Sequence, residues 1–583
     1  MALTASADRI VVLDGGLDPE AVDPAGRVFR TGDRTLVGPF TDGAGCGRCL
    51  AVRWRDTHVP PAGTEPCPGP PAVGSAPLVA ELLRTVHAPA GTAVVVVLED
   101  GDPRPRTVHL LPVLGCTGCT GSLRSPAPTP GLGPHQPGSG YRTRRPQDVG
   151  LPSAALVNPE LGLLGRRWGT DVTSPTAVPA GSAFSAVGAR GPVEITWGGQ
   201  GSSVRASRLT GLLEGLERHA GTDVRHAGRV RRSSLRALGR QALDVTALGV
   251  SVVPGARFRA EEGLPELPED AVVAWVPARS LVTGRERWIP KQLVHYHAPD
   301  AHPGFVQESS SGCASGTGED EAALHALLEL VERDAFLLTW HRGLDLPEVD
   351  LSTVADTTLR HTVRRAEFLG LTVRAFDGRV DLPFPVVVCS TERHDGGPGA
   401  VNFAAAASLD PLAALRSAVS EITARSPVLA EECAADPARL ERLAADPAAV
   451  RTLLDHAVLA GSPGFDRHVR GLLAHRRRYP LQHLFGPARH DGDVPGALRH
   501  VVAGLTTAGF EPWVVDQTTD EQAQLGLRTV RAVVPGLIPI DFGWHRQRAL
   551  SMPRLAAAEP TASPVRLPRP PAGHRRLVPH PFP

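Results

Sequence analysis

Lysine is almost absent from this sequence, and so are the features of membrane and secreted proteins. Lys291 is the only lysine, and the 61 basic residues equal the 61 acidic ones, so no net charge draws the chain to nucleic acid or to an anionic membrane. No run of about 18 apolar residues occurs, so no transmembrane helix is expected. The first residues also lack the basic segment and apolar run of a signal peptide. We therefore expect a cytoplasmic protein that binds neither nucleic acid nor membrane.

The chain is long enough for several domains. Its 583 residues, 42% of them hydrophobic, predict two to four domains with a large core. Short apolar runs at 9–14 and 92–100 indicate strands in a first unit, residues 1–124. Residues 125–148 are rich in proline and glycine and predict a linker. Helical patterns alternate with strand-like runs over residues 149–583. The fold class is therefore mixed α/β, with a smaller α/β domain first.

The second unit has a recognisable series of elements. Its predicted helices cover residues 205–220, 319–340, 352–368, 411–426, 436–456 and 494–508, and its predicted strands cover 372–377, 385–390 and 531–536. The final residues are rich in proline. We expect them to form a tail without regular structure, which either docks on the body or frays.

Four of the eight cysteines form two pairs with the spacing of zinc knuckles. Cys46 and Cys49 lie in Gly-Cys-Gly-Arg-Cys, and Cys116 and Cys119 lie in Gly-Cys-Thr-Gly-Cys. Two Cys-x2-Cys units supply four thiolates, which predict a structural Zn2+ site with no open coordination position. The alternative is a redox dithiol, which usually has one such pair at the start of a helix. In a reducing compartment the number of ligands favours zinc.

Two segments 115 residues apart carry the same acids within leucine-rich helices. Each has two glutamates three residues apart and then an arginine, namely Glu214, Glu217 and Arg218 in residues 212–220, and Glu329, Glu332 and Arg333 in residues 327–335. Residues three and four apart share a helix face, and apolar residues border that face here. One interpretation is a solvated acidic face. The other is a partly buried site where Mg2+ neutralises the carboxylates and the arginines contact phosphate. The repeat alone leaves both open.

A segment rich in serine and glycine, residues 309–318, directly precedes the second acidic helix. We expect it to be a loop whose backbone N–H groups, together with the helix N-terminus, approach a phosphate. It lacks the Gly-Lys-Ser/Thr sequence of a P-loop. Its position before the acidic helix is what links it to a nucleotide.

Several of these motifs, in this order, resemble those of the YcaO superfamily. Residues 309–335 resemble the central ATP-binding motif of that family, residues 210–218 its first motif, and residues 414–425 its third helix. The terminal Pro-His-Pro-Phe-Pro resembles the end of azoline-forming members. The resemblance covers residues 150–583.

The resemblance implies an ATP site in which glutamates from several helices hold Mg2+ against the triphosphate. The implied magnesium ligands are Glu214, Glu217, Glu329 and Glu332. The implied ATP-binding residues are Thr210, Arg218, Ser311, Thr317, Glu321, Arg333, Glu421 and Arg425. The implied catalytic residues of the tail are Pro579, Pro581 and Pro583. The sequence departs from the family at Ser311, Thr317 and Thr423, where a hydroxyl replaces a frequent side-chain amide.

The cysteine-bearing segments resemble the zinc-containing, E1-related domain of thiazole- and oxazole-forming cyclodehydratases. Only 45 residues precede Cys46, too few for a leader-binding winged helix as well. We therefore expect a separate ThiF-like partner that carries the leader-recognition (RRE) module. No flavin signature is present, so a separate flavin dehydrogenase is expected to oxidise the azoline. The family suggests a homodimer.

The resemblance implies ATP-dependent cyclodehydration of Cys, Ser or Thr in a ribosomally synthesised precursor peptide (RiPP), of bacteriocin or thiopeptide type. The product would be a thiazoline or an oxazoline. One alternative is thioamide formation by the same activation of the backbone. The other is a non-catalytic adaptor that binds precursor and partner enzyme. It predicts no ATP turnover.

Overall fold

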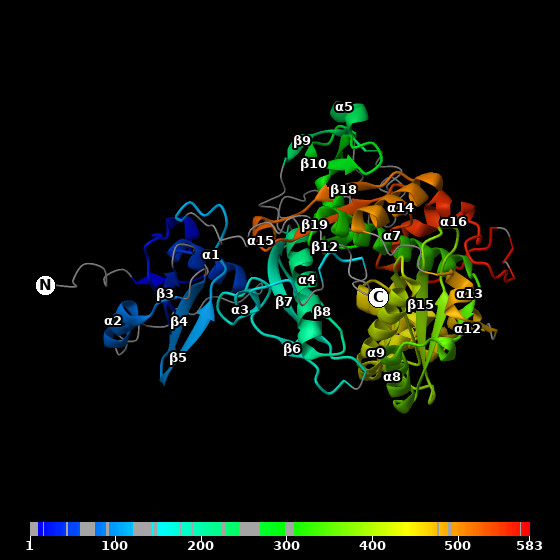
Figure 1. Cartoon of the computed structure of the whole chain (residues 1–583), viewed down its shortest axis with the longest axis horizontal. Coiled ribbons are helices and arrows are strands. Elements are labelled where there is room, and N and C mark those ends of the chain that lie inside the picture. The colour runs from blue at the N-terminus through cyan, green and yellow to red at the C-terminus, as the bar shows by residue number, and fades with distance from the viewer. Residues whose placement is uncertain are drawn as a thin grey trace.

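A computed structural model describes most of the chain. The described residues are 10–14, 17–41, 45–58, 76–88, 92–119, 141–144, 148–174, 176–188, 191–222, 229–243, 269–297, 308–474, 477–487, 493–568, 570–571 and 573–582. Most of the predicted linker lies outside these ranges. Its described end, residues 141–144, packs against the C-terminal part, with Tyr141 buried. Four sheets follow one another through the molecule (Figure 1).

The N-terminal sheet has five strands in sequence order, β1 to β5. The strands are Val11–Val12, Val28–Thr31, Arg34–Thr41, Ala93–Glu99 and Asp102–His109. Helix α1 (Gly47–Thr57) packs on one face through Leu50 and Trp54, and helix α2 (Ala76–Thr85) lies on the other. Because both faces are covered, β4 is a continuous run of buried valines rather than an alternating strand.

The next sheet, β6–β7–β8, supports the first acidic helix. Its strands are Gly169–Thr170, Ala180–Gly188 and Gly191–Gly199, and helix α4 (Val204–Thr222) packs on it. The short helix α3 (Ser153–Leu156) precedes this sheet. Close contact requires glycine at Gly215, since a Cβ there would stand 3.0 Å from the Trp197 ring. The sheet thus fixes which face of α4 points away from it.

A six-stranded sheet lies behind the second acidic helix. The path β11–β10–β18–β19–β12 comprises Glu286–Pro290, Val273–Ser280, Trp513–Asp516, Arg528–Val533 and Cys313–Gly316, with β9 (Arg231–Ser233) also pairing with β10. The predicted loop over residues 309–318 is wrong for four of its residues. Residues 313–316 are β12, because Cys313 pairs with Arg531 and Gly316 with Arg528 in an antiparallel ladder.

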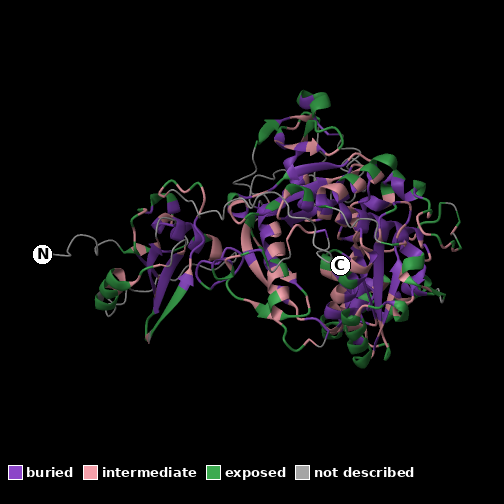
Figure 2. Cartoon of the chain, in the orientation of Figure 1, coloured by how far each residue is buried: buried purple, intermediate pink, exposed green. Residues whose placement is uncertain are grey.

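Helix α7 (Glu319–Arg342) connects two sheets. Its first half packs on the six-stranded sheet and on α14 (Val494–Thr507), and its second half packs on a five-stranded sheet. Acids in its first turn and Arg342 in its last suit the helix dipole, and Gly343 ends it with φ 63°. Most of its surface is buried (Figure 2), so it is one of the central elements of the C-terminal part.

The fourth sheet carries the third helix of the site. Its order β16–β15–β14–β13–β17 comprises Val401–Ala407, Val386–Arg393, Leu371–Asp377, Glu348–Val349 and Arg478–Tyr479. Helices α8 (Thr357–Phe368) and α9 (Pro411–Ala435) cover one face. Helix α9 begins at Pro411, with Asp410 accepting from the Leu412 N–H, and runs past Pro427, farther than predicted. Burial of Leu429 and Cys433 offsets the lost hydrogen bond.

The predicted helix 436–456 is wrong as a single element. It is divided into α10 (Pro437–Ala445), a short 3-10 turn at Pro447–Ala449 and α11 (Leu453–Leu459). Pro447 ends the first helix, and a capping box between Thr452 and Asp455 starts the next. The other α-helices among the described residues are α5 (Leu235–Leu238), α12 (Asp466–Leu473), α13 (Leu481–Phe485), α15 (Asp520–Gln524) and α16 (Pro553–Ala557).

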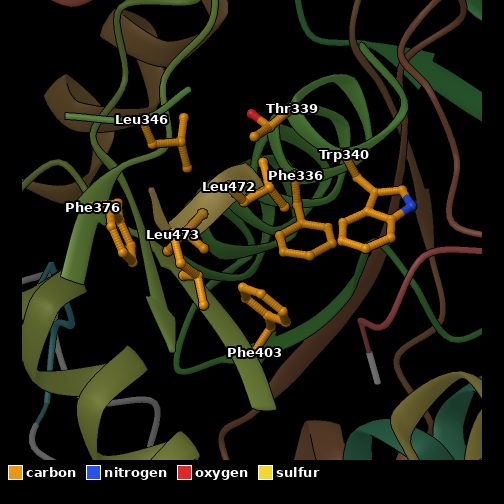
Figure 3. Close-up of a pocket in the computed structure, with 9 residues that line it drawn as sticks. Phe336, Thr339, Trp340, Leu346, Phe376, Phe403, Leu472 and Leu473 are labelled. Atoms are coloured by element: carbon orange, nitrogen blue, oxygen red, sulfur yellow. The ribbon is translucent and has the colours of Figure 1, made fainter. Parts of the chain in front are cut away.

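The proline-rich tail is docked rather than frayed. It runs along α7, where Trp340 Nε1 donates to the Val578 carbonyl at 3.2 Å. Phe582 is buried and its ring lies 4.3 Å from that of Phe336. Figure 3 shows Phe336, Trp340 and Phe403 around a small apolar cavity beside this anchor. The tail thereby becomes part of the core.

Three buried histidines hold the tail. His456 on α11 stacks on His580 at 4.1 Å between ring centroids, and His341 lies edge-on to His580. His456 Nε2 accepts from the Gly543 N–H at 2.8 Å, so its Nδ1 carries the proton and donates to the His580 carbonyl at 2.6 Å. Burial lowers the pKa of both His341 and His456 to about 4. The anchor therefore requires neutral imidazoles.

Acid is predicted to loosen the tail. Since these pKa values lie below the unfolded value of about 6.5, the stabilisation is present above about pH 6.5 and is lost as the pH falls towards about 4, with a maximum of about 3 kcal/mol per histidine. Hydrogen–deuterium exchange of the C-terminal peptide, corrected for intrinsic rates, should show less protection at about pH 4.5 than at about pH 7. The loss should be smaller in His456→Asn. Equal protection at both pH values would contradict the assignment.

Candidate active site and metal centre

Carboxylates from three helices meet in the C-terminal part of the chain. They are Glu214 and Glu217 on α4, Glu329 and Glu332 on α7, and Glu421 on α9. Burial and the charges of neighbouring glutamates both raise the pKa values of Glu217, Glu332 and Glu421, so these acids are enclosed neighbours and not a solvated face. The cluster still keeps some accessible surface, with 33% of the Glu214 side chain, 27% of Glu329 and 12% of Glu332 exposed. This combination suits a site that a small ligand enters.

The electrostatics of the cluster favour a bound cation. Burial, followed by the charges of Glu329 and Glu214, raises the pKa of Glu217 well above its usual value. Burial raises the pKa of Glu332 to about 8, and Glu421 adds to that effect. Because a carboxylate with a raised pKa is unfavourably placed when ionised, a divalent ion that neutralises several of them relieves the cost. All-oxygen ligands fit Mg2+.

Arginines follow the acids on each of the three helices. Arg218 Nε donates to Glu214 at 2.8 Å. Arg333 lies 3.2 Å from Glu332 and 3.7 Å from Glu329, and its guanidinium covers the ring of Phe582. Arg425 has a buried Nε with no hydrogen-bond partner among the described residues. These cations can meet the oxygens of a polyphosphate.

Three hydroxyl residues of the family motifs have different environments. Ser311 is buried, and its Oγ has no partner within the described part of the chain, so it is available to a ligand. The Thr423 hydroxyl instead donates to the Val419 carbonyl at 2.7 Å and is fully buried. Thr210, on α4, is exposed. Thr423 is thus committed to its own helix.

Glu321 and Thr317 belong to a separate network. Glu321 is buried and accepts from the Thr317 hydroxyl at 2.8 Å, the Thr143 hydroxyl at 2.8 Å and Arg142 at 3.2 Å. Its carboxylate therefore closes the start of α7 and holds residues 142–143 there. Among the described residues, the hydrogen-bond partners of Glu321 are Arg142, Thr143 and Thr317 and do not include the five clustered glutamates.

Arg531 is a site residue that the sequence reasoning missed. It stands on β19 opposite Cys313, donates to the Ser309 carbonyl, and lies 3.4 Å from the Cys313 sulfur. Burial raises the pKa of Glu329, and the charges of Arg333 and Arg531 oppose that rise. The available signal was an arginine within the apolar run Val530–Ala532, a position that requires a charged partner when buried.

The four knuckle cysteines converge as predicted. Their sulfur atoms all lie within 4.8 Å of one another, with Cys46–Cys116 and Cys49–Cys119 both at 3.6 Å. Tetrahedral coordination with Zn–S bonds of about 2.3 Å places sulfurs about 3.8 Å apart, so the set fits zinc. The Val113 N–H points to Cys49 Sγ and the Gly118 N–H to Cys116 Sγ, both at 3.4 Å. Such donors stabilise thiolates.

Comparison with known proteins identifies the family. The family described as YcaO cyclodehydratase, ATP- and Mg2+-binding, matches residues 198–538, which is more than half of the chain. The chain is a member of the YcaO family. All three acidic helices fall within the matched region. The resemblance seen in the sequence and the mixed α/β fold class are both confirmed.

Two solved heterocyclases share the YcaO fold of this chain. A heterocyclase in complex with substrate and cofactor is 21% identical with a TM-score of 0.66, covering 92% of this chain and 77% of that one. The heterocyclase TruD is 20% identical with a TM-score of 0.58, covering 93% of this chain and 74% of that one. The similarity extends beyond the family match to the N-terminal sheet.

A curated relative from Rhizobium leguminosarum bv. trifolii is an uncharacterised protein encoded in the tfuA 3′ region. It is 32% identical over 117 residues, which cover 19% of this chain. The chain spans 28% of the length of that relative.

No helix in the described part of this YcaO chain is long and apolar enough to cross a membrane.

Glu217→Gln is predicted to stabilise the metal-free protein by about 1 kcal/mol, because it removes a buried repelled charge. Since the pKa of Glu217 is raised in the folded state, the cost of its ionisation grows as pH rises above about 4.5, so the gain should be larger at about pH 8 than at about pH 5. Thermal unfolding in the presence of a chelator should show a higher unfolding midpoint for the variant than for wild type. The rise in midpoint that Mg2+ and ATP give should be smaller in the variant. Glu194→Gln, at an exposed β8 position, is the matched control. A lower unfolding midpoint than wild type in chelator would refute the prediction.

The purified chain is expected to carry about one zinc ion. Cys116→Ala should abolish retention of that ion, because three thiolates remain where the closed site needs four. Cys433→Ala, a buried cysteine of another core, should retain it. Elemental analysis by plasma mass spectrometry measures both. Full zinc occupancy in Cys116→Ala would rule out the tetrathiolate site.

Proposed function

We propose that the chain is an ATP-dependent cyclodehydratase that converts Cys, Ser or Thr of a ribosomally synthesised precursor peptide to thiazoline or oxazoline. The observation that carries the proposal is the enclosed cluster of five glutamates on α4, α7 and α9, with an arginine on each helix. Membership of a family described as ATP- and Mg2+-binding supports it.

Each group in the cluster receives a role. Glu214, Glu217, Glu329 and Glu332 would hold Mg2+, which when bound neutralises charge on the triphosphate. Arg218, Arg333 and Arg425 contact phosphate oxygens, and the free hydroxyl of Ser311 hydrogen-bonds to the nucleotide. Glu421 orients Arg425, and Thr210, Thr317 and Glu321 shape the edges of the site.

The reaction needs charge neutralisation and positioning more than covalent chemistry by the protein. The peptide side chain adds to the preceding amide carbonyl carbon and gives up its proton. The carbonyl oxygen then takes the γ-phosphoryl group of ATP, and ADP leaves. Loss of phosphate together with the amide proton forms the C=N bond of the azoline. The arginines on α4, α7 and α9 stabilise the negative charge that moves through these steps.

The tail takes part through its contacts with Arg333. Pro579 and Pro581 are buried and fix the chain next to Phe582, whose ring lies 4.5 Å from the Arg333 guanidinium carbon. Pro583 lies outside the described residues. We assign the tail the task of ordering Arg333 within the cluster.

The proposal also includes the domain organisation, the partner proteins and the oligomeric state of the chain. Residues 1–124 form the zinc domain, residues 125–148 a linker and residues 149–583 the ATP-dependent domain. Leader recognition falls to a separate ThiF-like partner with an RRE module, and azoline oxidation to a separate flavin dehydrogenase. The chain acts as a homodimer in the cytoplasm. One structurally similar heterocyclase has been solved in complex with substrate and cofactor, which supports the binding of both a substrate and a cofactor by this chain.

Intact-peptide mass spectrometry tests the function. The chain, ATP, Mg2+, the neighbouring leader-binding protein and a precursor rich in Cys and Ser from the same locus are mixed. We expect ATP-dependent loss of about 18 Da per ring, abolished in Glu329→Ala by a factor of about 100 or more. Glu319→Ala, at an exposed position of the same helix, is the control. An unchanged peptide mass with wild type, despite bound zinc and partner, would favour the adaptor, and a gain of about 16 Da would favour thioamidation.

A further inference from the structure

A fully buried ion pair joins the zinc domain to the C-terminal part. Arg53 on α1 and Glu521 on α15 are 0% and 1% exposed, and Arg53 Nη2 lies 2.7 Å from Glu521 Oε1. The two residues are 468 positions apart. Figure 1 shows α15 at the edge of the C-terminal part that lies nearest to α1. A buried pair of this kind costs desolvation, so its retention calls for an explanation beyond stability.

On the zinc side, Arg53 is tied to both knuckles. It stands one helical turn after Cys49 on α1. Its Nε donates to the Leu111 carbonyl at 3.0 Å and its Nη2 to the Pro112 carbonyl at 3.1 Å. The next residue, Val113, directs its N–H at Cys49 Sγ. The position of Arg53 therefore depends on the segments that the zinc site fixes.

On the other side, the pair is tied to the acidic helix. Gln522, next to Glu521, is fully buried and donates through Nε2 to the Leu216 carbonyl of α4 at 3.0 Å. Leu216 lies between the two glutamates of α4. The same Nε2 donates to Thr529 Oγ1 at 2.7 Å, and Thr529 is 2.5 Å from Ser315 of β12. The Gln522 side chain thus contacts α4 directly and is linked to β12 through Thr529.

We propose that Arg53, Glu521 and Gln522 are positioning residues for the nucleotide site, through which zinc binding and Mg2+–ATP binding reinforce each other. The proposal rests on the proposed ATP site. Zinc orders α1 and Arg53. The ion pair then fixes α15, and Gln522 fixes α4 and β12 at the spacing that the glutamates need. Because coupling between two binding sites is reciprocal, bound nucleotide must also slow the loss of zinc.

Two variants separate this coupling from simple support of the fold. Gln522→Met breaks the link to α4 and leaves the ion pair intact. Arg53→Met with Glu521→Leu removes both buried charges together, so neither is left unpaired. Arg34→Met is the matched control. It weakens a different pair between the two parts, Arg34–Glu160 at 2.8 Å, which makes no contact with α4.

Calorimetric titration of the full chain with Mg2+–ATP is the first measurement. Both coupling variants should keep zinc and bind about tenfold more weakly than wild type, while Arg34→Met binds as wild type. The second measurement is zinc release to a zinc-selective chelator. Mg2+–ATP should slow release about tenfold in wild type and in Arg34→Met, and have no effect in Gln522→Met.

The possible results distinguish a failure of the coupling from a failure of the proposed function. Wild-type affinity for Mg2+–ATP in variants that retain zinc would overturn the coupling and leave the proposed function standing. The coupling would also be overturned if Mg2+–ATP did not change the rate of zinc release from the wild-type chain. Absence of Mg2+–ATP binding by the wild-type chain would overturn the proposed function, and the coupling with it.

Discussion

Repulsion among enclosed carboxylates is the constraint on which the C-terminal part depends. Burial raises the pKa values of Glu217, Glu332 and Glu421, and the charges of neighbouring glutamates raise them further. A fold would not gather these groups for stability, because each ionised carboxylate costs free energy there. The surrounding sheets must therefore be rigid enough to hold the three helices together against this repulsion. The charges of Arg333 and Arg531 offset part of it at Glu329. A bound cation would offset more.

Helix α7 is held rigidly against this repulsion because it is buried along most of its length. Its apolar side chains do not form one stripe, because its first half faces the six-stranded sheet and its second half the five-stranded sheet. Glu329 and Glu332 stand where these two contacts meet. The tail then covers the remaining side, with Phe582 between Phe336 and Arg333. The same helix thus fixes the acids, the arginine and the tail that orders it.

Local patterns predicted the helices of the site, and they failed where long-range pairing decides. The spacing of Glu214 with Glu217, and of Glu329 with Glu332, required only helical periodicity. Residues 313–316 became a strand because β19, about 200 residues away, pairs with them. The role of Arg531 depends on the same pairing. No local signal could have linked Arg53 to Glu521, since each is an ordinary charged residue in its own segment.

The two metal sites differ in chemistry in a way that suits different tasks. Four thiolates around a zinc ion would leave no position for substrate, so the N-terminal site suits a structural role. The glutamate cluster offers hard oxygens that keep accessible surface, so it can share an ion with phosphate. A zinc ion that stays bound would fix the surrounding segments. Those segments could then position the residues that hold the exchangeable Mg2+. The buried path from Arg53 to Leu216 supplies the mechanical connection. It consists of the Arg53–Glu521 ion pair, the peptide bond between Glu521 and Gln522, and the hydrogen bond from Gln522 to Leu216, all away from solvent that would weaken them.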